Sequence, residues 1–99
     1  MILKQSNKIV KRLITSDQIR AARALLNWSA NDLADASKVG VATIRRFEIQ
    51  NGVPSGQVRI LESLINALEY AGVEFIGTPE DGPGVRLTSK KVANDPSKI

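Results

Sequence analysis

One stretch of the chain, residues 33–54 (LADASKVGVATIRRFEIQNGVP), constrains the fold more than any other. It predicts the end of a short helix, a tight turn at residues 37–40 and a second helix that carries two adjacent arginines. Asn51-Gly52 and Pro54 end the second helix, because Asn-Gly is a turn signal and proline cannot continue a helix from its N-terminal side. Helices of about two turns are marginal alone, so this pair must be held by packing.

Capping signals predict further helices on both sides of this stretch. Thr15 and Gln18 have the spacing of a capping box, in which the hydroxyl and the amide satisfy backbone N–H groups. Ser29 is the expected cap of the following helix. A longer helix with a wide apolar face is expected between Ser55, as its cap, and Gly72, as its C-terminal stop.

The periodicity changes after this helix from helical to alternating. Residues 73–76 and 85–88 are β-prone, and an eight-residue loop rich in turn formers separates them. The two segments could close as a hairpin or pair across two chains. The expected fold is therefore mainly α, with four to five helices and a short C-terminal β hairpin or β tail. The predicted divisions are a flexible basic arm (1–14), a helical domain (15–72) and a β-containing tail that is a candidate dimerisation element (73–99).

Composition excludes several classes of function. The 99 residues include no cysteine and no histidine, which removes disulfides, the usual zinc sites and histidine acid–base catalysis. The acids are scattered and no glycine loop has phosphate-binding spacing, so we expect neither an enzyme nor a cofactor or metal site. No apolar run approaches the ~20 residues of a membrane helix, so no membrane association is expected.

The charge is segregated along the chain. The formal net charge is +4, which favours polyanionic partners. Residues 60–83 carry five acids and no base, whereas residues 38–59 carry four bases and one acid. The four bases of this basic block are Lys38, Arg45, Arg46 and Arg59. Two short helices joined by a tight turn, with a basic outer face on the second, follow the helix-turn-helix plan.

The segment that contains this helix-turn-helix pattern resembles a known family. The segment WSANDLADASKVGVATIRRFEIQNGVP resembles the lambda-repressor/Cro-like helix-turn-helix domains, also called the XRE family. The resemblance spans about residues 15–72, and the tail AGVEFI…GPGVRL looks like that of small single-domain bacterial regulators in this family. The matching positions are Leu33-Ala34 in the first helix, Val39 in the turn, Thr43-Ile44 and Glu48 in the second helix, and Pro54 after it.

The resemblance implies that the helix near residues 40–50 enters the DNA major groove. Val41 and Ala42, at its exposed start, are expected to contact thymine methyl groups. Arg45 and Arg46 are expected to bind guanine O6/N7 or phosphates, and Thr43 to contact phosphate or cap locally. An ordinary solvated helix face is the alternative. The expected backbone contacts are Ser29, Lys38, Gln50, Asn51 and Arg59.

The sequence departs from the family pattern at three positions. Lys38 replaces a turn glycine, so it must adopt a left-handed or altered conformation at some cost. Ala30 replaces a frequent glutamine, and Gln50 replaces the glycine that usually ends the recognition helix. Arg23 and Glu48 match a pair that the family uses to join the first helix to the recognition helix.

The predicted function is sequence-specific DNA binding by a homodimeric transcriptional regulator, a repressor at an inverted-repeat operator. The expected location is the bacterial cytoplasm, in association with the nucleoid. The fourth helix and the β segments are the expected dimer surfaces. Two alternatives stay open. The chain could be an autoregulatory antitoxin with a toxin partner, or a protein-binding module that has lost its DNA contacts.

Overall fold

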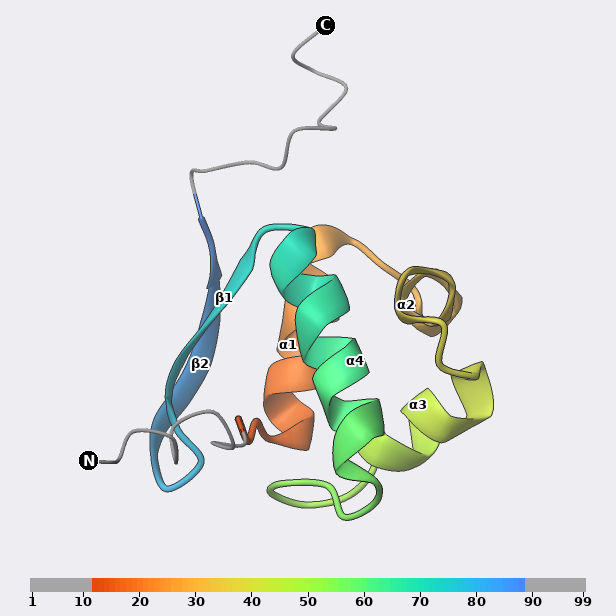
Figure 1. Ribbon diagram of the computed structural model, residues 1–99. Helices are drawn as coiled ribbons and strands as arrows, with labels where there is room; N and C mark the ends of the chain where they lie inside the picture. The colour runs from red at the N-terminus through yellow and green to blue at the C-terminus, as the bar shows by residue number, and fades with distance from the viewer. Residues whose placement is uncertain (1–11, 89–99) are drawn as a thin grey trace, which may run out of the picture.

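The computed structural model describes residues 12–88, in which four helices precede a two-stranded antiparallel sheet (Figure 1). The mainly α architecture with a C-terminal β hairpin is confirmed. The elements are α1 (Ser16–Leu26), α2 (Ala30–Ser37), α3 (Val41–Glu48), α4 (Val58–Tyr70), β1 (Val73–Thr78) and β2 (Asp81–Leu87).

Both predicted helix caps at the N-terminal end of the domain are present. Thr15 Oγ1 accepts a hydrogen bond from the Gln18 N–H (3.1 Å), and the Thr15 N–H donates to Gln18 Oε1 (2.8 Å), which forms a complete capping box. Ser29 makes the same reciprocal pair with Asp32 at the start of α2. These bonds satisfy N–H groups that have no partner within the helix.

The start of α4 differs from the prediction. Its N-cap is Gln57 rather than Ser55, and no side chain caps it. The Ser55 N–H and hydroxyl instead bond to Gln50 Oε1 (2.9 and 3.2 Å), which holds Ser55 in the preceding loop. At the other end the helix stops at Tyr70, and Gly72 follows with a φ of 112°, as its expected role requires.

The hairpin closes within one chain, and its strands are longer than predicted. The pairing runs from Val73↔Leu87 to Thr78↔Asp81, so only two residues connect the strands. The predicted eight-residue loop is therefore wrong, because β2 begins within it at Asp81. Gly77 makes this possible. It lies at an irregularity in the register with a φ of 76°, and a Cβ there would be 2.0 Å from the Gly82 carbonyl oxygen.

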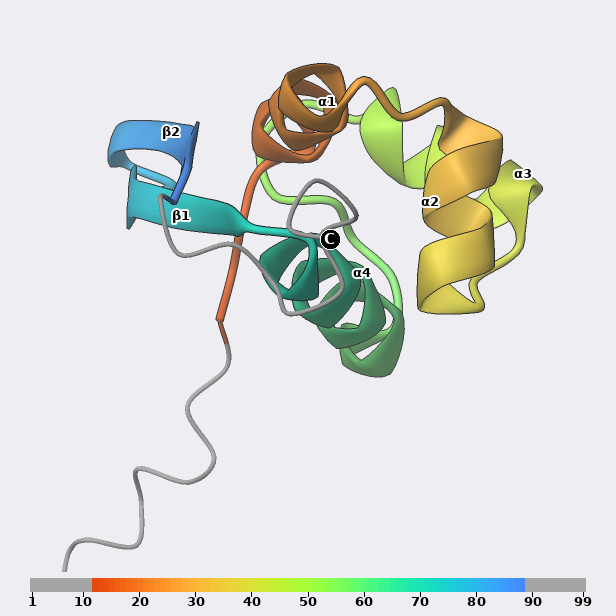
Figure 2. The same cartoon turned by 90° about the horizontal axis from the view of Figure 1, so that it is seen from above.

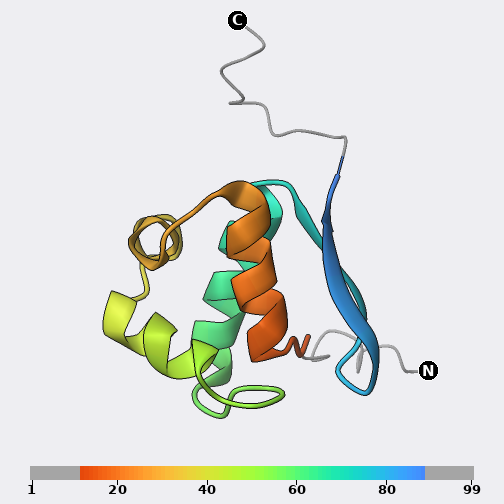
Figure 3. The same cartoon turned by 180° about the vertical axis from the view of Figure 1, so that it is seen from behind.

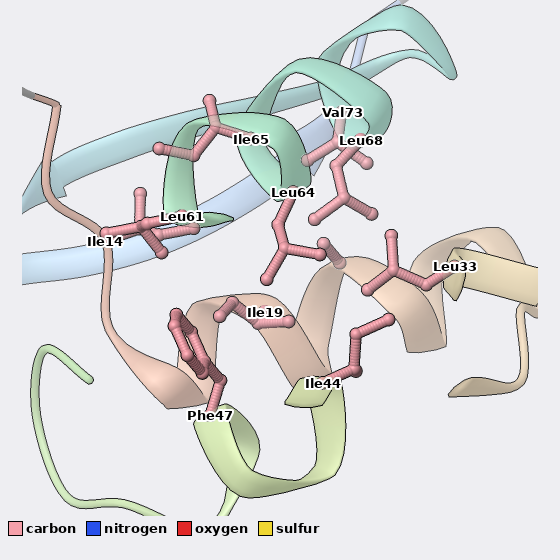
Figure 4. Close-up of a cluster of buried hydrophobic side chains, with 11 residues drawn as sticks. Ile14, Ile19, Leu33, Ile44, Phe47, Leu61, Leu64, Ile65, Leu68 and Val73 are labelled. Carbon is pink, nitrogen blue, oxygen red and sulfur yellow. The ribbon is translucent and has the colours of Figure 1, made fainter. Parts of the chain in front are cut away.

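The core lies between three layers of structure. Figures 2 and 3 show α1 and α4 in the middle, with the hairpin on one side and α2 and α3 on the other. Figure 4 shows Ile44 and Phe47 of α3 pointing toward Ile19 of α1. The buried apolar side chains of the core are Ile14, Ile19, Ala22, Leu33, Ile44, Phe47, Leu61, Leu64, Ile65, Leu68 and Val73.

The N-terminal part of the described chain belongs to this body. Ile14, predicted to lie in a basic arm, is 4% exposed and packs in the core. Arg12 forms an ion pair with Glu69 of α4 at 2.6 Å. The remainder of the predicted arm, residues 1–11, and the end of the predicted tail, residues 89–99, lie outside the described residues. None of the helices described is long and apolar enough to cross a membrane.

Candidate nucleic-acid interface

A three-residue turn connects α2 to α3. Lys38 adopts φ 65° and ψ 23°, the left-handed conformation expected of it, and its N–H donates to the Ala34 carbonyl at 2.8 Å. The Ser37 hydroxyl donates to the Leu33 carbonyl (2.7 Å) and accepts from the Val39 N–H (3.2 Å). These bonds give partners to the Ala34 carbonyl and the Val39 N–H, and they fix the turn without glycine at residue 38.

One side of α3 is buried and the other is open to solvent. Ile44 is fully buried and Phe47 is 2% exposed, as their spacing predicts. Ala42, Arg45 and Arg46 are exposed on the other side. Because the helix is anchored by its apolar side, its basic side is presented outward in a fixed orientation.

The C-terminal end of α3 is held by an ion pair with α1. Arg23 Nε and Nη2 donate to the two carboxylate oxygens of Glu48, each at 2.8 Å, and Arg23 Nη1 donates to the Trp28 carbonyl at 3.0 Å. The Glu48 side chain is only 7% exposed. The hydrogen bonds with Glu48 raise the pKa of Arg23 above its ordinary value, against the lowering effect of partial burial. This is the pair that the family resemblance implies.

Two further α1 side chains hold the same end of α3. The Ser16 hydroxyl, fully buried, donates to the Phe47 carbonyl at 2.6 Å. Arg20 donates to the Glu48 carbonyl and also pairs with Asp17. Sequence reasoning missed both roles. The contacts join residues about thirty positions apart, and no local pattern marks a serine or an arginine as the partner of a distant carbonyl.

The predicted site residues fall into two groups by exposure. Ser29, Lys38, Ala42, Arg45, Arg46 and Asn51 are exposed, whereas Val41, Thr43 and Gln50 are half-buried. The structure brings those from Lys38 to Asn51 together on the turn, on α3 and just after it. Ser29 lies apart, at the N-terminus of α2, where its hydroxyl oxygen accepts from the Asp32 N–H.

Gln50 has a structural role in addition to any contact with a ligand. Its amide nitrogen donates to the carbonyls of Arg46 (3.2 Å) and Ser55 (3.4 Å), and its oxygen accepts from the Ser55 N–H. The side chain therefore closes the loop after α3, and a phosphate contact at this position would compete with these bonds.

Ion pairing divides the basic residues of the described chain into two equal groups. Four arginines form ion pairs, and they are Arg12, Arg20, Arg23 and Arg86. The other four cations between residues 12 and 88, whose side chains have no hydrogen bond or ion pair with that part of the chain, are Lys38, Arg45, Arg46 and Arg59. Three of the four lie on the α2–α3 turn and on α3, and Arg59 lies at the start of α4.

The candidate interface presents exposed cations on the α2–α3 turn and on α3. No group of three or more acids within residues 12–88 is placed to hold a metal ion. A comparison with models of known protein families finds no match, and a search of curated proteins finds no significant relative.

Proposed function

We propose that this chain is a lambda-repressor-like, XRE-type DNA-binding protein that regulates transcription, with α3 as its recognition helix. The observation that carries the proposal is that three of the four unpaired cations defined above lie on the α2–α3 turn and on α3. A folded domain that pairs its other described arginines internally gains no stability from leaving these four unpaired. Phosphates and guanine edges are the partners that such a cluster fits.

The shape and chemistry of α3 support this assignment. An α-helix fits the major groove, and the exposed side of its N-terminal half meets base edges there. Ala42 and the half-buried Val41 lie at that end, where thymine methyl groups are the apolar partners available. Arg45 and Arg46 lie one turn further along, with free guanidinium groups that fit guanine or phosphate. We therefore expect a half-site that contains both thymine and guanine.

One such helix contacts too few base pairs for selectivity, so we propose that a homodimer binds an inverted repeat as a repressor. Most of the apolar face of α4 packs inside its own chain, which leaves less of it for a dimer than the sequence predicts. The apolar side chains that remain on the surface include Val58 (42% exposed), Tyr70 (66%) and Leu87 (46%). These positions at the two ends of α4 and on β2 are the candidate contacts of the dimer.

The test is a selection of bound sequences from a random DNA pool, followed by gel shifts with the selected site. The selection reports the half-site, the spacing and the symmetry of the dimer together. Replacing Arg45 and Arg46 together by alanine is expected to abolish specific binding, because each bidentate arginine–guanine contact contributes about 1–3 kcal/mol of discrimination. Unchanged affinity of this double variant for the selected site would refute the proposal.

A matched control is Arg86→Ala, which also removes an exposed arginine but on the hairpin, where it pairs with Glu74. Its affinity for DNA is expected to match that of the wild type. Binding of the wild type should weaken steeply with salt, because phosphate contacts release counterions. Lys38→Ala should weaken binding to all sequences alike and reduce the salt slope by about one.

A further inference from the structure

A cavity of about 350 Å³ opens on the hairpin side of the molecule, away from the proposed DNA interface. It lies between residues 12–14, the C-terminal half of α4 and β1. The volume falls within the ~300–1,000 Å³ typical of sites for small ligands. Neither α2 nor α3 contributes to its lining.

The lining combines an apolar floor with one pair of opposite charges. Arg12 and Glu69 form the 2.6 Å ion pair with side chains 51% and 36% exposed, so both groups are open to water and the pair contributes little to stability. Thr78 Oγ1 accepts from the Asp81 N–H, and its hydroxyl hydrogen can still donate. The apolar lining residues are Leu13, Ile14, Ile65, Phe75 and Pro79.

These groups fit a zwitterionic ligand better than a ligand that carries a single charge. A fatty acid would place its carboxylate beside Glu69, and an alkylamine would place its ammonium group beside Arg12. A zwitterion satisfies both charges, because its carboxylate can bind Arg12 and Thr78 while its ammonium group binds Glu69. We infer that the cavity binds a free α-amino acid with an apolar side chain, which covers the floor beside Leu13.

Occupancy of the cavity is transmitted to α3 through the start of α1. Gln18 lines the cavity, and its amide donates to the carbonyls of Ile76 (3.2 Å) and Gly84 (2.9 Å) on the hairpin. Ser16, between the lining residues Ile14 and Gln18, donates through its N–H to the Gly52 carbonyl (2.9 Å). Its hydroxyl binds the last turn of α3, as described above. A ligand that moves this segment therefore alters the support of α3, and its effect on DNA binding rests on the proposed function.

The test is an NMR titration of the ¹⁵N-labelled full chain with L-leucine in the absence of DNA. Saturable shifts are expected at the amides of Leu13, Phe75 and Thr78, with smaller ones at Phe47 and Gly52. N-acetyl-leucine and leucinamide, which each lack one charge, should bind about tenfold more weakly or worse, since each loses a charge-assisted hydrogen bond. This ligand series needs no substitution, so it stays informative whatever the variants do.

Variants test the two charges from the side of the protein. Arg12→Gln and Glu69→Gln should each weaken leucine binding about tenfold, while Arg86→Gln, another exposed arginine paired with a glutamate, should not change it. Equal binding of leucine and leucinamide, or no saturable shift with leucine or phenylalanine, would overturn the site. Shifts confined to the lining residues would overturn the transmission to α3. Because DNA is absent, these failures are separate from any failure of the proposed function.

Discussion

The ion pair between Arg23 and Glu48 gives the sharpest prediction about stability. The Glu48 carboxylate is 7% exposed and its described partner is Arg23, whereas Arg23 is 22% exposed and also binds the Trp28 carbonyl. Removing the arginine therefore leaves a buried charge without a partner, and removing the glutamate leaves a cation that can reach water. Arg23→Met should be the more damaging change.

The magnitudes follow from the burial. Breaking a fully buried pair by removing one partner costs about 3–5 kcal/mol, and the partial exposure of Arg23 places the loss near ~3 kcal/mol. Glu48→Leu should cost about 1–2 kcal/mol, the range for a hydrogen-bonding group left partly solvated. The double variant, Arg23→Met with Glu48→Leu, should regain about 2 kcal/mol over Arg23→Met, because apolar side chains can replace a buried pair nearly neutrally.

Urea denaturation of the four proteins measures these differences, with a constant m-value as the condition for comparing them. A double variant as unstable as Arg23→Met would refute the argument from an unpaired buried carboxylate. In the wild type the pKa of Arg23 is raised, so its contribution to the free energy of unfolding is fully present at every pH below the ordinary pKa of arginine. No change is therefore expected from Arg23 around neutral pH.

Three further predictions concern the turn, the first helix and the hairpin. Lys38→Gly should stabilise the domain by about 0.5–1 kcal/mol in thermal melts, because it relieves a left-handed lysine, while the control Asn27→Gly should gain less since asparagine tolerates its φ of 59° better. Ser16→Ala should cost about 1–3 kcal/mol by leaving a buried carbonyl without its donor, and a loss near zero would contradict the role given to this hydroxyl. The hydrogen bond from Arg86 lowers the pKa of Glu74. The pair therefore stabilises the hairpin fully at pH values above the ordinary pKa of a glutamate, and this stabilisation is lost as the pH falls through the lowered pKa. Glu74→Gln should therefore lower the melting temperature slightly at neutral pH and not in strong acid.

The local features of this fold could be predicted from the sequence because each depends on neighbouring residues. Both capping boxes are pairs three residues apart, and the buried side of α3 is visible in the spacing of Ile44 and Phe47. The left-handed turn at Lys38 could be expected because the resemblance places a glycine there. The start of α4 could not, since Ser55 is a good cap in isolation and only its contact with Gln50 removes it from that role.

The contacts that support the candidate site could be predicted only in part, because they join distant segments. The pair of Arg23 and Glu48 was available through the family resemblance alone, and no spacing rule connects residues 25 positions apart. The length of the hairpin was missed for a related reason. Gly77 has the appearance of a loop residue, but it permits a register irregularity that lets the strands continue to a two-residue turn.

Polar side chains from the first to the last turn of α1 hold the C-terminal end of α3, and under the proposed function this affects DNA binding. The recognition helix in the proposed function packs on α2, but the polar contacts at its C-terminal end come from Ser16, Arg20 and Arg23. A change on α1 can therefore tilt α3 without altering any side chain that faces DNA. In such a variant, contacts near the C-terminal end of α3, at Arg45 and Arg46, should weaken before those at Val41 and Ala42. Ser16→Ala should accordingly relax selection at the base pairs contacted by the arginines and leave the thymine positions selected. Equal relaxation at all positions would mean that α3 loosens as a whole and that α1 does not set its angle.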